Sequence, residues 1–174
     1  KSALMYLKKF EADIKDVPGP GVVTICGRYW AMDRDQRWER VERAWRLMVA
    51  AEGDRAPDAI TAIEAAYTRG ETDEFVAPTA IDTFTGIQDG DGICMANFRA
   101  DRAREILLAL LDPKFGNFTR PRNVSFATAV ALTEYSTRLN ELMSVLFASA
   151  SLDHILGQTI SDAGLKQLRI AETE

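Results

Sequence analysis

The chain has 174 residues, of which 47% are apolar and 27% charged, and its formal net charge is −5. This composition is typical of a globular protein with one substantial core, and it excludes intrinsic disorder, collagen and coiled coil. The longest apolar runs fall far short of the roughly 20 residues that a membrane span requires, and no signal-peptide pattern opens the chain. The acidic balance argues against nucleic acid as a partner, because that binding depends on a summed positive field. We expect a cytoplasmic protein with no membrane contact and reduced cysteines.

Hydrophobic periodicity predicts alternating helices and strands in the first half of the chain. Residues 2–16 carry apolar side chains at helical spacing, with Ser2 as a candidate N-cap. The β-branched run 22–26 is bounded by glycines and is typical of a buried, parallel strand. A helix is predicted over 37–51, and another begins at Asp58 and ends at Gly70. Strand, loop and helix in this order indicate an α/β unit.

The second half continues in the same order. A short strand is predicted near 79–81, residues 89–92 read as a tight turn, and a second apolar strand covers 93–97. A helix over 100–111 and a strand within 124–132 follow. We predict an α/β fold, a three-layer domain with a mainly parallel sheet flanked by helices.

The tail predicts a helix through Leu152 and Ile160 that stops at Gly164, and a short strand near 167–171. The polar stretch at the start of 133–150 separates two apolar segments and is the expected domain boundary.

Arginine is in marked excess, with 15 Arg against 6 Lys. A guanidinium grips a carboxylate or phosphate through two parallel hydrogen bonds, which an ammonium group cannot do. Arg28 and Arg34 follow the strand 22–26, while Arg99 and Arg102 follow the strand 93–97. In open α/β sheets ligands bind beyond the carboxyl ends of strands, so these four arginines are candidates for binding a small anion. If Arg99 is already helical, Arg102 lies on the same face and two forks close on one anion.

The alternative is that these arginines are solvated and pair with acidic neighbours, namely Asp33, Asp35 and Asp101.

Other candidates for functional residues are weaker. His154 is the only histidine and has no cysteine beside it, so we expect no metal site in this chain. Trp38 and Trp45 lie seven residues apart on one helix face and are expected in the core. The pattern identifies no nucleophile, and hence no catalytic residue.

A longer pattern is more specific. Residues 27–40 read GRYWAMDRDQRWER, which resembles the GRY-x-x-MDRD-x-RW-x-R signature of cofactor-independent phosphoglycerate mutases, members of the alkaline-phosphatase-like superfamily. Further similar segments follow in the family's order: GETDEFV at 70–76, DGDGI at 89–93, NFRADRAR at 97–104 and LKQLRIAETE at 165–174. The resemblance therefore covers nearly the whole chain.

The resemblance implies an isomerase that interconverts 3-phosphoglycerate and 2-phosphoglycerate in glycolysis and gluconeogenesis. A phosphatase-like domain would hold two manganese ions and a transiently phosphorylated serine, and an inserted phosphotransferase domain would bind substrate. Residues 1–140 resemble part of the inserted domain, and residues 141–174 a hinge and return segment. The family's substrate-binding arginines match Arg28, Arg34, Arg99 and Arg102, the same four that position had selected.

The family's nucleophile, its metal ligands and its GRD substrate motif have no counterpart in this chain. The resemblance therefore implies a fragment that is incomplete at its amino end, inactive alone, and partnered by the phosphatase-like domain of the same polypeptide. Two alternatives remain: a stand-alone, non-catalytic module that binds phosphate or carboxylate, and a related mutase acting on a sugar phosphate.

Overall fold

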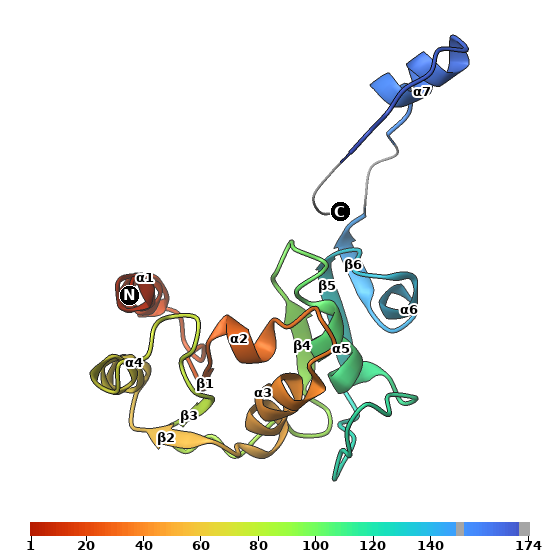
Figure 1. The fold of residues 1–174 in the computed structure, drawn as a ribbon. Coiled ribbons are helices and arrows are strands. Elements are labelled where there is room, and N and C mark those ends of the chain that lie inside the picture. The colour runs from red at the N-terminus through yellow and green to blue at the C-terminus, as the bar shows by residue number, and fades with distance from the viewer. Residues whose placement is uncertain (149–151, 171–174) are drawn as a thin grey trace.

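The computed structural model describes residues 1–148 and 152–170. In chain order the elements of this part are α1 (Ala3–Ile14), β1 (Thr24–Ile25), α2 (Arg28–Ala31), α3 (Trp38–Ala50), β2 (Asp54–Ala56), α4 (Ala59–Thr68), β3 (Thr79–Ile81), β4 (Gly92–Met95), α5 (Arg104–Leu111), β5 (Thr128–Thr133), α6 (Thr137–Asn140), β6 (Ser144–Phe147) and α7 (Leu156–Asp162). In Figure 1, α1 and α4 lie at one end of the molecule and sheet strands β4, β5 and β6 at the other, with α2 and α3 between them.

The strands form two sheets of three strands each. Sheet A has the order β1-β3-β2, with β2 parallel to β3 and β1 antiparallel to it. Sheet B has the order β4-β5-β6 and is parallel throughout. The predicted α/β class with mainly parallel strands is therefore confirmed, although the strands are divided between two sheets.

The first strand differs from its prediction. The apolar run 22–26 was expected to be a buried parallel strand, but β1 spans only Thr24–Ile25 and runs antiparallel to β3. Val23 is 49% exposed, because this strand lies at the edge of sheet A and has a neighbour on one side only. An apolar run does not encode strand direction. The chain passes through α3, β2 and α4 before β3 returns beside β1 from the opposite direction.

Helix α3 forms the centre of the core. Val41 and Trp45 are at most 1% exposed and pack with Ile106 of α5, while Leu47 packs with Ala80 of sheet A. This helix therefore connects sheet A to the region of α5 and sheet B. Trp45 lies in the core as predicted, and Trp38 packs against the same cluster at its edge.

Local signals predicted the long helices well. The carboxylate of Asp58 accepts a hydrogen bond from the Thr61 amide at 2.7 Å and caps α4, and Gly70 follows that helix with φ +86°. The elements α2, β2, α6 and β6 were not predicted. They are only three or four residues long, and tertiary pairing rather than local pattern creates them. Strand β2, for example, is held by its register with β3.

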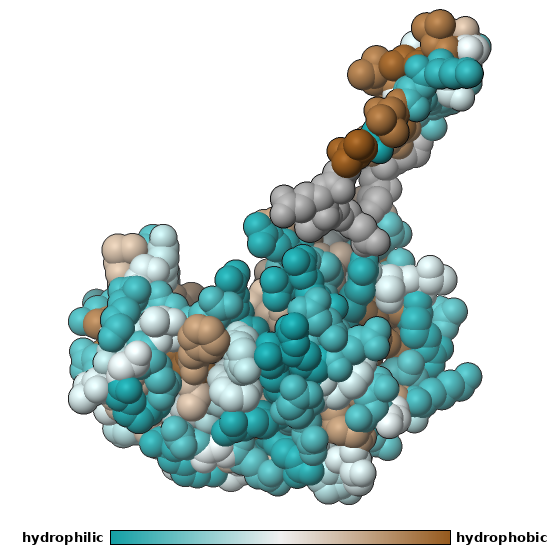
Figure 2. Space-filling model, viewed as in Figure 1, coloured by the Kyte–Doolittle hydropathy of each residue, from teal (hydrophilic) through white to brown (hydrophobic). Residues whose placement is uncertain are grey.

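Residues 152–170 project from the rest of the molecule and carry α7 (Figure 1). Figure 2 shows apolar side chains gathered on this projection, among them Leu156, Leu168 and Ile170, each at least 75% exposed.

The predicted end of the helix at Gly164 is confirmed by the φ of +69° at this residue. The predicted strand near 167–171 is wrong over its described residues, because residues 167–170 pair with no strand. The side-chain amide of Gln167 donates to the Gly157 carbonyl at 2.7 Å, and residue 171 lies outside the described part. None of the helices described is long and apolar enough to cross a membrane.

Gly27 joins β1 to α2 at a point of close backbone approach. Its amide donates to the Val76 carbonyl at 2.8 Å, and the Tyr29 amide donates to the Glu74 carbonyl at 3.1 Å. A Cβ atom on Gly27 would lie 2.1 Å from the Glu74 carbonyl oxygen, which is backbone and cannot move aside cheaply. Glycine is therefore required here by space, and this contact fixes where Arg28 begins α2.

We predict that Gly27→Ala lowers the free energy of unfolding by about 1–3 kcal/mol, because the added methyl group forces the two backbone segments apart. Gly21→Ala is the matched control, since a Cβ atom there meets nothing within 4 Å. Urea unfolding of the two variants beside the parent protein measures the difference. Equal stability of both variants would contradict the packing described for Gly27.

Candidate functional site

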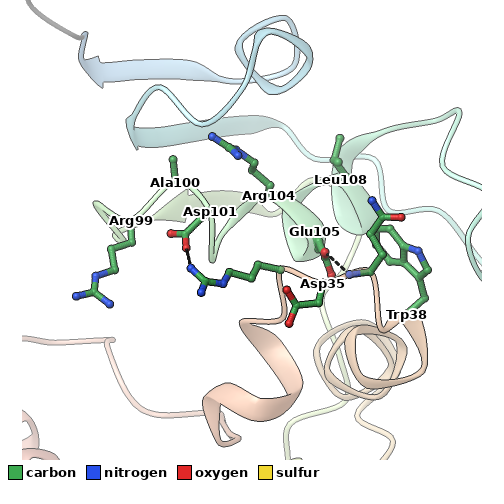
Figure 3. Close-up of a pocket in the computed structure, with 10 residues that line it drawn as sticks. Asp35, Trp38, Arg99, Ala100, Asp101, Arg104, Glu105 and Leu108 are labelled. Atoms are coloured by element: carbon green, nitrogen blue, oxygen red, sulfur yellow. Dashed lines mark hydrogen bonds and ion pairs between the residues drawn. The ribbon is translucent and has the colours of Figure 1, made fainter. Parts of the chain in front are cut away.

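An open cavity of about 1070 Å³ lies where the loop between α2 and α3 meets the start of α5 (Figure 3). We call residues 32–37 the first loop and residues 97–103 the second loop. The cavity is lined by Arg34, Asp35, Gln36, Trp38, Arg99, Ala100, Asp101, Arg104, Glu105 and Leu108. Three of these residues are arginines and three are acidic, so the lining carries charges of both signs.

The first loop is organised by the buried carboxylate of Asp33. Its Oδ2 accepts hydrogen bonds from the backbone amides of Asp35 at 3.0 Å and Arg37 at 2.9 Å. These bonds stabilise the backbone directly before α3. Its Oδ1 lies 3.6 Å from a guanidinium nitrogen of Arg37 and 3.6 Å from one of Arg40. Burial would raise the pKa of Asp33, but the two backbone hydrogen bonds and the nearby charge outweigh it and lower the pKa.

Gln36 adopts a left-handed backbone conformation with φ +61°. For a residue with a side chain this conformation costs about 1–2 kcal/mol. The first loop is therefore held in a shape that its own residues do not favour, and contacts from outside the loop must maintain it.

The second loop is shaped by Asn97, whose side-chain oxygen accepts a hydrogen bond from the Arg99 amide at 2.9 Å. The buried hydroxyl of Tyr135 donates to the backbone carbonyl of Asn97. These two contacts turn the chain after β4 and leave Arg99 exposed at the cavity.

Three hydrogen bonds connect the two loops and α5. The Arg34 guanidinium donates to the Asp101 carboxylate at 2.8 Å, the Arg102 guanidinium donates to the Met32 carbonyl at 2.9 Å, and the Gln36 amide donates to Glu105 Oε1 at 2.9 Å. Figure 3 shows the first and third of these. The loops therefore form one unit, although more than 60 residues separate them in the sequence.

The pair of Arg34 and Asp101 is partly open to solvent, with side-chain exposures of 42% and 39%. The hydrogen bond from Arg34 lowers the pKa of Asp101 and holds it ionised. An ion pair at this exposure contributes about 0–1 kcal/mol, so an incoming anion can replace Asp101 on the guanidinium at little cost.

The structure brings together only part of the predicted set. Arg34 and Arg99 line the cavity. Arg102 lies beside it, part-buried and bonded to the first loop. Arg28 does not line the cavity; it is half exposed and its Nε lies 3.2 Å from Glu74 Oε1. Arg34 pairs with Asp101, which the alternative named, but this contact connects the two loops across 67 residues and does not join sequence neighbours.

The proposed placement of Arg99 and Arg102 on one helix face is wrong. Helix α5 begins at Arg104 and not at residue 100, because the Arg99 amide bonds to the Asn97 side chain and residues 101–103 form a turn. Sequence reasoning also missed Arg104 and Glu105 as lining residues. Arg104 directs its guanidinium to the Tyr135 carbonyl at 2.7 Å. Arg104 is the last residue of the NFRADRAR segment at 97–104, which was the available signal, whereas only burial identifies Glu105.

Over residues 1–148 and 152–170, no group of three or more His, Cys, Asp or Glu side chains is arranged to hold a metal ion.

The fold and site together define an α/β domain with an open cavity lined by arginines and carboxylates. The profile of one protein family, described as "BPG-independent PGAM N-terminus (iPGM_N)", matches residues 1–137. The chain is 47% identical over 174 residues to the 2,3-bisphosphoglycerate-independent phosphoglycerate mutase of Rhodopseudomonas palustris, and 44% identical over 174 residues to that of Paracoccus denitrificans. Each of these two alignments covers all of this chain and 34% of the length of the relative.

A solved structure of Leishmania mexicana phosphoglycerate mutase at low cobalt concentration superposes with a TM-score of 0.81 and 25% identity, covering 94% of this chain and 32% of that one. The chain thus spans about a third of the length of the proteins it matches. It belongs to the family of BPG-independent phosphoglycerate mutase N-terminal regions.

We predict that Asp33→Asn lowers the free energy of unfolding by about 1–3 kcal/mol at pH 7, because the buried backbone amides and guanidinium groups lose a charged acceptor. The folded-state pKa of Asp33 is depressed, so its stabilisation is complete above the ordinary aspartate pKa of about 3.9 and is lost as the pH falls through the lower folded value. The difference between variant and parent should therefore shrink below about pH 4.

Urea unfolding as a function of pH measures this, with Asp13→Asn as the control because Asp13 is exposed and pairs only with Lys9 at the surface. A pH-independent difference, or one no larger than that of the control, would refute the role of Asp33.

Proposed function

We propose that this chain is the substrate-binding, phosphotransferase part of a phosphoglycerate mutase that interconverts 3-phosphoglycerate and 2-phosphoglycerate through a phosphoserine intermediate. The observation that carries the proposal is the cavity in which Arg34 and Arg99, from the two loops, face the same space in a member of this family. The names of the relatives support the reaction. Their greater length favours a part of a larger enzyme over a stand-alone anion-binding module.

The substrate would carry a carboxylate and a phosphate, and the proposed binding residues are Arg28, Arg34, Arg99 and Arg102. Arg34 and Arg99 can reach a ligand in the cavity from where they stand. Arg102 anchors the first loop and retains further N–H donors toward the ligand. Arg28 must leave Glu74 and reorient to join them, which its 53% exposed side chain allows.

The contribution of these arginines is orientation and charge neutralisation. During transfer through a phosphoserine, the glycerate must stay bound while it turns its other hydroxyl toward the phosphoryl group. Guanidinium forks hold the carboxylate and neutralise charge on the phosphoryl oxygens as transfer occurs. Each such contact contributes about 1.5–3 kcal/mol when it is shielded from water.

In this proposal the serine and the metal ions belong to the phosphatase-like remainder of the same polypeptide. The family resemblance implies that the metal ions are two manganese ions. Residues 1–140 would form the binding part and residues 141–174 the return toward that remainder, although β6 pairs with β5 across this division. We propose a cytoplasmic enzyme of glycolysis and gluconeogenesis, in the alkaline-phosphatase-like superfamily.

We predict that Arg34→Ala and Arg102→Ala, each made in the full-length enzyme, lower kcat/KM for 3-phosphoglycerate at least about tenfold, because each removes a charged donor to the substrate or its loop. Arg55→Ala is the control, because Arg55 lies on β2 and bonds only the carbonyls of Asp82 and Phe84. Thermal unfolding of each variant shows that the fold persists. Parent-like turnover in both cavity variants would rule out the proposed function.

A further inference from the structure

Glu105 is a buried carboxyl group at the start of α5 that the proposed chemistry does not use. The residue is 8% exposed and lies in the first turn of the helix. Its Oε1 accepts the hydrogen bond from the Gln36 amide at 2.9 Å. Its Oε2 is buried and has no hydrogen-bond donor in the described part of the chain. A buried carboxylate oxygen without a donor is costly, so this group requires an explanation.

The side chain of Asp33 lies within hydrogen-bonding reach of the Glu105 carboxyl group. Burial raises the pKa of Glu105, and the charges of Asp33 and Asp35 raise it further, while the pKa of Asp33 is lowered. When this pair holds a single proton, the proton lies on Glu105, since Arg37 and Arg40 favour the ionised form of Asp33.

These contacts act on the backbone of the first loop on both sides of Arg34. Asp33, directly before Arg34, holds the amides of Asp35 and Arg37. Glu105 holds the amide of Gln36, which has the unfavourable φ of +61°. Of the groups outside the first loop, Glu105 is therefore the one that bonds the strained residue.

We propose that Glu105 is a positioning residue for Arg34: from the first turn of α5 it holds the Gln36 amide and, in its protonated form, donates a hydrogen bond to Asp33, and so fixes the loop that presents Arg34 to the cavity. The effect on substrate rests on the proposed function, but the effect on the loop does not. Glu105 lines the cavity but its Oε1 is bonded to the first loop, so we place its effect on Arg34 and not on the reacting atoms.

Ionisation of Glu105 would break this arrangement, because two carboxylates would then face each other. The charged and titratable groups around it are Asp33 and Asp35 of the first loop, Arg37 and Arg40 beyond Asp33, and Arg34, Asp101 and Arg104 along the cavity. The folded-state pKa of Glu105 is raised, so its contribution is complete below the ordinary glutamate value of about 4.3 and is lost as the pH rises through the higher folded value.

Three variants of the full-length enzyme test the proposal. Glu105→Ala removes both contacts, and Glu105→Gln keeps an acceptor for Gln36 and a donor for Asp33 without the titration. Glu39→Gln is the matched control, because Glu39 also lies in the first turn of a helix, α3, but is exposed. The readouts are kcat and KM for 3-phosphoglycerate across pH, and amide hydrogen exchange of residues 33–37 without substrate.

We expect Glu105→Ala to raise KM about tenfold while kcat changes less than about threefold, and to speed exchange in residues 33–37. Glu105→Gln should stay within about twofold of the parent in KM and exchange, and should lose the rise in KM that the parent shows toward high pH. Glu39→Gln should match the parent throughout.

The proposal is overturned if Glu105→Ala matches Glu39→Gln in KM and exchange, if Glu105→Gln is as defective as the alanine variant, or if it keeps the parent's pH profile. Should the alanine variant fail to fold, the glutamine variant alone decides. An enzyme that binds and isomerises no 3-phosphoglycerate contradicts the proposed function, and hydrogen exchange then still decides whether Glu105 holds the loop.

Discussion

The structure of this site depends on the connection between two loops that are distant in the sequence. The first loop leads into α3 and the second into α5, and these helices pack through Val41, Trp45 and Ile106 in the core. The core therefore sets the distance between the loops, and the hydrogen bonds from Arg34, Arg102 and the Gln36 amide fix their orientation. Positive side chains are held at one cavity in this way, although like charges repel.

The site balances this charge with carboxylates of two kinds. Asp33 is buried and organises backbone, so it is part of the framework. Asp101 and Glu74 are partly exposed and pair with Arg34 and Arg28, so an anionic ligand can displace them. Pairing in the unliganded protein and the proposed anion binding are therefore compatible, because a partly exposed ion pair is weak enough to be exchanged for a ligand.

The sequence was sufficient for features with a local cause. The Asp58 cap, the helix through Trp45 and the apolar strand at Ile93 follow from residue type and periodicity. The direction of β1, the start of α5 and the separation into two sheets depend on the route of the chain and on side-chain contacts such as Asn97 to Arg99. For the same reason, position after strands selected four arginines, but it could not show that Arg28 lies off the cavity or that Glu105 supports it.

The central claim is that the two loops form one anion site. It is tested most directly by a crystal structure of the full-length protein with 3-phosphoglycerate bound. The account predicts the ligand between the first and second loops, with its carboxylate or phosphate oxygens in hydrogen-bond contact with the guanidinium groups of both Arg34 and Arg99. A ligand bound elsewhere, with these two side chains left in solvent, would contradict it.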